Sequence, residues 1–325
     1  MIRYRDLNRG VVLAWSALVV VYLVWGSTYL AIRVGVRDLP PGIMAGIRYL
    51  IAGALLYPVA IRTGDAQTRA VDRPGRKQWL ACGVVGLLLL VLGNGGVSVA
   101  EQTVPSGLAA LLVATVPLWM ILFAVPIQHQ RIGGRAAMGL LLGLIGVAVL
   151  AGGGLQGGPL SGALIVLGAS AAWGLGSVLG HRLPLPRRVL VAAAIEMLIG
   201  GVILLVAAAV GGEFAHVRWG DVHATSWFAL IWLILPGSIL AFTAYGYSLA
   251  HLPVSTVSTY AYVNPVVAVI LGTALLNEAF GPREILGAVL VVASVALTLH
   301  HTSKPTDERE QRESPAPLER TSSDG

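Results

Sequence analysis

The sequence lacks most features of a soluble enzyme. Only 12% of its residues are charged, whereas a soluble domain carries roughly a quarter. Its single cysteine, Cys82, excludes an internal disulfide, and redox chemistry is not indicated. It has no GxxxxGK[ST] phosphate loop, no HExxH motif and no cluster of histidines and cysteines with metal-ligand spacing. We therefore expect no direct use of ATP, no cofactor and no metal.

What the sequence does contain is apolar residues, which make up 56% of the chain and give a mean hydropathy of +0.77. They form unbroken runs of about 20 residues, the length of a helix that crosses a bilayer core. The runs predict an all-α polytopic membrane protein with ten transmembrane helices. These lie at about 12–34, 42–61, 79–99, 104–126, 134–152, 160–180, 189–210, 227–248, 254–276 and 283–300.

The positive charges predict the orientation of these spans, because lysine and arginine accumulate on the cytoplasmic side. Most of the 22 lysines and arginines fall on the side of the N-terminus. Only Arg33, Arg37, Arg218 and Arg283 fall on the opposite side. Both termini are therefore expected in the cytoplasm. The net charge of +6 follows from this distribution and gives no reason to expect a nucleic-acid partner.

A shift of 148 positions superimposes one half of the chain on the other. Trp25 and Trp173 each precede a glycine, and the same shift brings Pro117 onto Pro265. Matches at one shift, spread over half the chain, indicate an internal repeat. With five spans each, the halves have inverted topology. In transporters of that architecture the substrate binds near the membrane midplane, at the repeat interface.

The repeat divides the chain into four segments. Residues 1–11 form a cytoplasmic N-terminus, and 12–152 form the first five-helix repeat. Residues 160–300 form the second repeat. Residues 301–325 are too polar to bury a core, so we expect a disordered cytoplasmic tail.

Three stretches resemble a known transporter group. They are "WGSTYLAIRVGVRDLPPGIMAGIRYLIAGALL", "GNGGVSVAEQTVPSGLAALLVATVPLW" and "STYAYVNPVVAVILGTALLNE". They resemble the drug/metabolite transporter superfamily, and most closely its EamA family and the YedA-type inner-membrane exporters within it. The resemblance covers about residues 12–300. It implies ten helices, cytoplasmic termini and export of small metabolites or drugs. It also implies a cavity lined by spans one, three, four, six, eight and nine.

We expect aromatic, hydroxyl and amide side chains of these spans to line that cavity. The candidates are Trp25, Ser27, Thr28, Asn94, Thr115, Trp119, Trp173, Tyr245, Tyr260 and Asn264. For the two tryptophans that precede glycine, two alternatives stay open: a wall of the cavity, or packing for close helix contact. Tyr245 and Tyr247 are two positions apart on one helix and cannot share a face, so at most one lines the cavity.

Pro117 and Pro265 fall near the middle of spans four and nine. Each removes a backbone hydrogen bond and frees the carbonyl four residues earlier, at Val113 and Ala261. We expect helix kinks at both prolines. These kinks either form a hinge or binding site, or are structural kinks whose carbonyls are satisfied by neighbouring groups.

Charged residues inside the spans are costly and are candidates for function. Arg48 and Glu196 occupy equivalent repeat positions, but their spans run in opposite directions, so we expect a depth difference of roughly 10 Å and no ion pair. Arg48 either snorkels to the headgroups or binds an anionic substrate group. Glu196 is a proton-coupling carboxylate or a structural hydrogen-bond acceptor. Glu101 either stabilises a helix N-terminus or acts as a gate or proton-entry acid, and Glu278 is expected to be only solvated.

The sequence therefore predicts a secondary transporter of a bacterial inner membrane that exports small, amino-acid-like or amphipathic solutes by alternating access. Coupling of this export to protons is a further hypothesis. Its expected partners are a small-molecule substrate and the lipid bilayer, and the chain is a monomer or a homodimer. The alternatives are a membrane sensor or scaffold, or an intramembrane enzyme. The enzyme would need a nucleophile and a base at one depth, and the histidines lie at helix ends.

Overall fold

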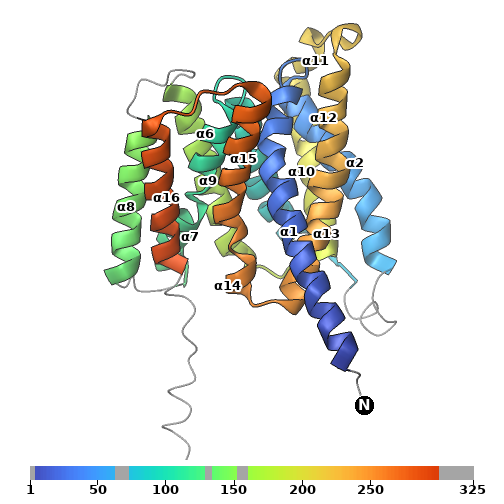
Figure 1. Cartoon of the computed structure of the whole chain (residues 1–325). Helices are drawn as coiled ribbons and strands as arrows, with labels where there is room; N and C mark the ends of the chain where they lie inside the picture. Colours follow the sequence, from blue (N-terminus) through green and yellow to red (C-terminus); the bar gives the residue numbers. More distant parts are fainter. Residues whose placement is uncertain (1–3, 63–72, 129–133, 152–159, 300–325) are drawn as a thin grey trace, which may run out of the picture.

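A computed structural model describes residues 4–62, 73–128, 134–151 and 160–299. Within these ranges every regular element is a helix, so the expected all-α class is confirmed. The helices lie side by side in one bundle, with the short helix α11 (Glu213–His216) at the end opposite to the N-terminus (Figure 1). We call these two ends the α11 end and the N-terminal end.

The first half of the chain forms helices over each of its expected spans. A π-helical segment, η1, joins α4 to α5 without a break, and two turn residues separate α6 from α7. The bounds are α1 (Tyr4–Gly35), α2 (Pro41–Arg62), α4 (Arg76–Gly86), η1 (Leu87–Gly95), α5 (Gly96–Ala100), α6 (Ser106–Val113), α7 (Val116–Gln128) and α8 (Gly134–Ala151).

The second half repeats this order after the shift of 148 positions. Its third span again contains a π-helical segment, η3, and its fourth is again divided in two. The bounds are α9 (Leu160–Gly180), α10 (Val189–Val210), η2 (Trp219–Asp221), α12 (Ala224–Ile234), η3 (Leu235–Leu240), α13 (Ala241–His251), α14 (Val254–Val257), α15 (Tyr260–Leu276) and α16 (Pro282–Leu299). The expected tail after residue 300 lies outside the described residues.

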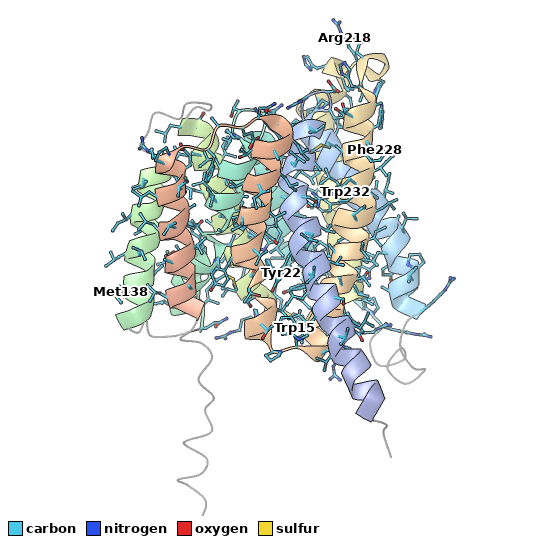
Figure 2. All side chains as sticks on the ribbon, in the orientation of Figure 1. Trp15, Tyr22, Met138, Arg218, Phe228 and Trp232 are labelled. Carbon is cyan, nitrogen blue, oxygen red and sulfur yellow. The ribbon has the colours of Figure 1, made fainter. Side chains whose placement is uncertain are left out.

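Within the described residues, seven helical segments are long and apolar enough to cross a membrane, and two further apolar helices are shorter. Large apolar side chains lie on the outer surface of the bundle, where Phe228 is 72% exposed and Met138 is 54% exposed (Figure 2). Many exposed side chains of this kind suit contact with lipid better than contact with water. The chain is therefore a polytopic membrane protein. The seven segments are Gly10–Gly35, Pro41–Arg62, Arg76–Ala100, Ser106–Gln128, Leu160–Gly180, Val189–Val210 and Ala224–His251.

The helices of one half pack mainly against those of the other. α2 lies against α10, and α8 lies against α16. α1 packs on α12, α13 and α15 of the second half. In the same way, α9 packs on η1, α5, α6 and α7 of the first half. The first helix of each half therefore lies against the third and fourth spans of the other.

Glycines allow these close approaches, and they do so at matching repeat positions. A methyl group added at Gly53 of α2 would lie 2.8 Å from the backbone nitrogen of Leu198 in α10. One added at Gly201 of α10 would lie 2.5 Å from the backbone nitrogen of Leu50 in α2. Both pairs differ by the same 148 positions. The helix backbones thus touch directly, which small residues permit inside membranes.

Candidate functional site

Trp25 of α1 is the centre of an aromatic cluster built from both halves of the chain. Its ring centroid lies 5.3 Å from that of Phe242, 5.2 Å from that of Tyr245 and 5.2 Å from that of Tyr260. The rings of Tyr245 and Tyr260 are themselves 5.8 Å apart and nearly perpendicular. We call these four side chains the Trp25 cluster. They bring α1, α13 and α15 together.

The Trp25 cluster is fixed to a π-helical segment. The indole Nε1 of Trp25 donates a hydrogen bond to the carbonyl oxygen of Gly237 in η3, at 3.2 Å. η3 begins at Leu235 and η1 begins at Leu87, which are equivalent positions of the repeat. π-Helical turns are rare and are frequent at functional sites. Sequence reasoning missed both segments, although Pro236 beside Gly237 was an available sign of irregular helix geometry.

Arg48 of α2 also contacts the π-helical segment η3. Its Nε donates to the hydroxyl of Ser238 at 3.0 Å, and its guanidinium lies 4.7 Å from the ring centre of Tyr49. The residue is only 4% exposed, so the snorkelling alternative is wrong for this conformation: the side chain ends on η3 and does not reach the surface. Among the described residues no carboxylate lies within ion-pair distance of Arg48.

The hydroxyl groups predicted beside Trp25 bond mainly to their own helix. Thr28 donates to the carbonyl of Trp25 at 2.6 Å, and Ser27 donates to the carbonyl of Val24 at 2.8 Å. Ser27 also accepts a hydrogen bond from Nε1 of Trp232, which is partly exposed on α12. Ser27 is thus engaged with Trp232 and makes no bond to the Trp25 cluster. Thr28 lies beside Gly237, the residue to which Trp25 bonds, and so stays near the Trp25 cluster.

The equivalent tryptophan, Trp173 of α9, lies in a second group of residues. A methyl group at Gly93 of η1 would lie 3.1 Å from its ring. Gly174 packs against Trp119 of α7, and Trp119 stacks on Phe123 with 6.2 Å between ring centroids. Within the described residues no ring contact joins this group to the Trp25 cluster. The predicted residues therefore form two groups, one on each side of the repeat.

Two of the remaining polar candidates, Thr115 and Asn264, use their side chains to bond to backbone carbonyls. The Thr115 hydroxyl donates to the carbonyl of Leu112 at 2.6 Å, and the backbone carbonyl of Asn94 accepts a bond from Ser98 at 2.9 Å. The amide nitrogen of Asn264, in the orientation its neighbours favour, lies 3.2 Å from the carbonyl oxygens of Tyr22 and Tyr260. Asn264 thereby joins α15 to α1. Of the two tyrosines of α13, Tyr247 instead stacks on His251.

The two mid-span prolines behave differently. The fourth span is interrupted at residues 114–115, just before Pro117. Pro265 lies inside α15, and the interruption of the ninth span falls earlier, at residues 258–259. The two interruptions therefore lie differently relative to the two prolines, and the kinks expected at Pro117 and Pro265 stay a prediction.

Glu278 caps a helix of the other half. Its carboxylate accepts hydrogen bonds from the backbone nitrogens of Ser106 and Gly107, at 2.9 and 3.1 Å, and from the Ser106 hydroxyl at 2.9 Å. It therefore satisfies the N-terminus of α6, where a carboxylate is favoured. The expectation that Glu278 is merely solvated is wrong. The helix-stabilising alternative for Glu101 is also wrong, because Glu278 fills that position.

Glu101 lies in the turn between the segments Arg76–Ala100 and Ser106–Gln128 and is 0% exposed. Within the described part of the chain, neither of its carboxylate oxygens has a hydrogen-bond partner. Burial raises the pKa of Glu101 well above its usual value, and the charge of Glu278 raises it further, whereas Arg33 opposes the shift. The structure thus holds an unsatisfied carboxyl group at the position for which a gate or proton-entry acid was the second alternative.

Glu196 of α10 lies elsewhere, within electrostatic reach of Cys82 of α4. A methyl group at Gly86 would lie 2.9 Å from the Glu196 backbone carbonyl, so α4 and α10 are in close contact here. Arg48 and Glu196 do not form an ion pair, because Arg48 ends at Ser238. The described residues contain no group of three or more potential metal ligands.

Comparison with known proteins accounts for the symmetric helix contacts. A model of the EamA-like transporter family matches residues 10–152 and, a second time, residues 160–300. The chain belongs to the EamA-like transporter family. This places it among transporters, and the two successive matches agree with the two similar halves whose contacts are described above.

Relatives of this EamA-like chain cover nearly its whole length. It is 42% identical over 291 residues to the uncharacterized inner membrane transporter YedA of Escherichia coli (strain K12), covering 88% of this chain and 90% of the relative. It is 30% identical over 289 residues to a probable terminal-alkyne amino-acid exporter of Streptantibioticus cattleyicolor, covering 88% and 93%. A solved crystal structure matches with a TM-score of 0.59 and 20% identity, over 93% of this chain and 99% of that chain, which shows a shared fold.

Proposed function

We propose that this protein is a secondary transporter that works by alternating access between two inverted five-helix halves, 12–152 and 160–300. One observation carries the proposal. Gly26 of α1 packs on Val267 of α15, and Gly174 of α9 packs on Trp119 of α7. Both contacts link the first helix of one half to the fourth span of the other, and they differ by 148 positions at each end. Such related interfaces are what two halves rocking about a shared site require.

The proposed substrate site is the Trp25 cluster together with Arg48. Both reach η3, at Gly237 and Ser238. Among the described residues the buried Arg48 guanidinium has no carboxylate partner, so it supplies a counter-charge for an anionic group, and the aromatic rings supply an apolar wall. This combination fits a small amino-acid-like or amphipathic solute. The probable amino-acid exporter of Streptantibioticus cattleyicolor and a probable amino-acid metabolite efflux pump of Salmonella typhimurium, 23% identical, are consistent with that class.

We further propose that the chain resides in a bacterial inner membrane with both termini in the cytoplasm. The arginine distribution supports this orientation, and the relative YedA is an inner membrane transporter. The α11 end then faces away from the cytoplasm, and transport is directed outward. The acting unit is a monomer or homodimer. Coupling to protons would use one of the buried carboxyl groups, Glu196 or Glu101.

Uptake into proteoliposomes tests the function. The full chain is reconstituted, and a panel of labelled amino acids and cationic drugs is offered at two proton gradients. The native chain should take up at least one solute saturably, and Trp25→Phe should weaken that uptake because it removes the bond to Gly237. Trp227→Phe is the matched control, since Trp227 stacks on Trp219 outside the Trp25 cluster. A well-folded preparation that moves no solute would support the sensor or scaffold alternative instead.

A further inference from the structure

The unsatisfied polar atoms of the protein gather in one place. In the described part of the chain, the buried side-chain atoms without a hydrogen-bond partner are the two carboxylate oxygens of Glu101 and the hydroxyl of Tyr49. Tyr29 links them, because it lies within electrostatic reach of both residues. Buried polar groups are nearly always hydrogen-bonded, so three exceptions in one cluster call for a specific explanation.

The charged and titratable groups that face Glu101 come from three parts of the bundle. Tyr29 and Arg33 belong to α1, Arg48 belongs to α2, and Glu278 follows α15. The two arginines favour a charged carboxylate, but among the described residues neither donates a hydrogen bond to its oxygens. Arg33 donates to the backbone carbonyl of Glu101, and the Nε of Arg48 donates to Ser238.

The charged form of Glu101 is therefore poorly supported in this conformation. It would be a buried carboxylate without a hydrogen bond, and it would lie near the negative charge of Glu278. Burying such a charge is costly, and a group in that position takes up a proton instead. The neutral carboxylic acid avoids the cost, and it leaves Arg33 and Arg48 in the contacts they make here.

Three other carboxylates hold the α11 end together around this group. Glu278 fastens the start of α6, as described above. Glu213 accepts hydrogen bonds from the backbone nitrogens of Gly42 and Ile43, at 3.2 and 2.9 Å, and so fastens the start of α2. Asp38 accepts a bond of 2.6 Å from Ser226 near the start of α12. Each of these contacts joins segments that are distant in sequence.

Separation of these segments would admit water to Glu101. A hydrated carboxyl group ionises at its ordinary pKa, and the adjacent Arg33 could then pair with it. Closing the α11 end reverses both changes. A ligand that binds one conformation better shifts the equilibrium toward it, so a proton on Glu101 stabilises the closed α11 end, and closure in turn raises the affinity of Glu101 for the proton.

We propose that Glu101 is the proton-binding site of this transporter, protonated while the α11 end is closed and deprotonated when it opens. The inference rests on the proposed function for the role of the proton in transport, but proton binding itself can be measured without transport. The proposal places the proton on Glu101 and not on Glu196. In the described part of the chain no arginine acts electrostatically on Glu196, so Glu196 has no described cation with which to pair after losing a proton.

Infrared spectroscopy of the full chain in lipid vesicles tests this, because a protonated carboxyl group has its own carbonyl stretching band. Near neutral pH the native chain should show a band component that is lost in Glu101→Gln and kept in Glu196→Gln. Glu101→Asp keeps a titratable acid and should show the component at a shifted frequency. A native chain without the band, or a component that survives Glu101→Gln and disappears in Glu196→Gln, would overturn the proposal.

The outcome is separable from that of the uptake assay. If Glu101→Gln removes the band component but the native chain transports no tested solute, the proton site stands and the proposed function fails. If the native chain transports a solute but the component survives Glu101→Gln, the proposed function stands and the proton site is overturned.

Discussion

Gly26 lies so close to Val267 that a methyl group added to the glycine would be 2.6 Å from the valine Cβ. Gly174 meets Trp119 in the same way, at 2.7 Å from its Cβ, one repeat length later. The glycine of each Trp-Gly pair therefore sets the distance between the two halves, while Trp25 also forms a wall of aromatic rings. Close helix contact, one of the two alternatives left open by the sequence, is therefore met at Gly26 and Gly174, and a cavity wall at Trp25 stays a prediction.

Replacing these glycines by alanine should destabilise the protein. Gly26→Ala and Gly174→Ala each force a methyl group into a closed interface, and overpacking of this kind costs about 1–3 kcal/mol. Thermal unfolding in detergent measures the change. Gly168→Ala on α9 is the matched control, because a methyl group there meets nothing within 4 Å. It should be neutral or slightly stabilising, since alanine is the better helix former. Equal losses at all three positions would contradict this packing account.

Arg48→Gln should weaken the binding of solutes that carry a carboxylate. Loss of a charge-assisted hydrogen bond costs about 1.5–3 kcal/mol, which corresponds to roughly 10- to 100-fold in affinity. Competition by a transported amino acid and by its carboxamide measures this directly. The native chain should prefer the acid, and Arg48→Gln should lose the preference while its affinity for the carboxamide changes little. An unchanged preference would remove Arg48 from the substrate site.

Glu278→Ala should destabilise the chain by about 0.5–2 kcal/mol, because it leaves the start of α6 without its cap. Asp221→Ala is the control, since Asp221 pairs with Arg218 only at 3.9 Å on a strongly exposed surface. Exposed ion pairs contribute little, so the control should change stability by less than about 1 kcal/mol. The account of the cap fails if the two variants are equally stable.

Protonation of Asp38 in acid should make the protein less stable. The Ser226 hydroxyl lowers the pKa of Asp38 below its usual value of 3.8, although partial burial opposes the shift, and bonds from His223 lower it further. A lowered pKa means that the contribution is present above pH 3.8 and is lost as pH falls through the folded-state value. Ser226→Ala should therefore reduce the acid-dependent part of the stability curve. Unfolding curves between neutral pH and about pH 3 measure it, and identical acid dependence in both chains would contradict the assignment.

The sequence was sufficient to predict what depends on hydropathy and on the repeat. Runs of apolar residues located the helices, and the shift from Trp25 to Trp173 predicted two similar halves, which the family model matches one after the other. Opposite span directions likewise predicted that Arg48 and Glu196 stay apart. Each of these features follows from residues close together in the chain or from one constant shift.

What could not be predicted depends on contacts between distant residues. Glu278 was expected to be solvated because its partner is not near it in the sequence. The backbone nitrogen of Ser106, which it caps, lies 172 positions away. The π-helical turn of η3 is stabilised where Trp25 and Arg48 reach it, and neither residue is near it in the sequence. Such features require the packed structure.

Counterflow in proteoliposomes tests the central claim most directly. Vesicles that contain the full chain are loaded with an excess of unlabelled solute, and entry of the same labelled solute is followed without any other gradient. A carrier that exposes one site alternately to the two sides should show a transient accumulation of label that saturates with solute concentration, and Arg48→Gln should reduce it. Label that only equilibrates, at a rate proportional to its concentration and independent of the internal solute, would contradict alternating access.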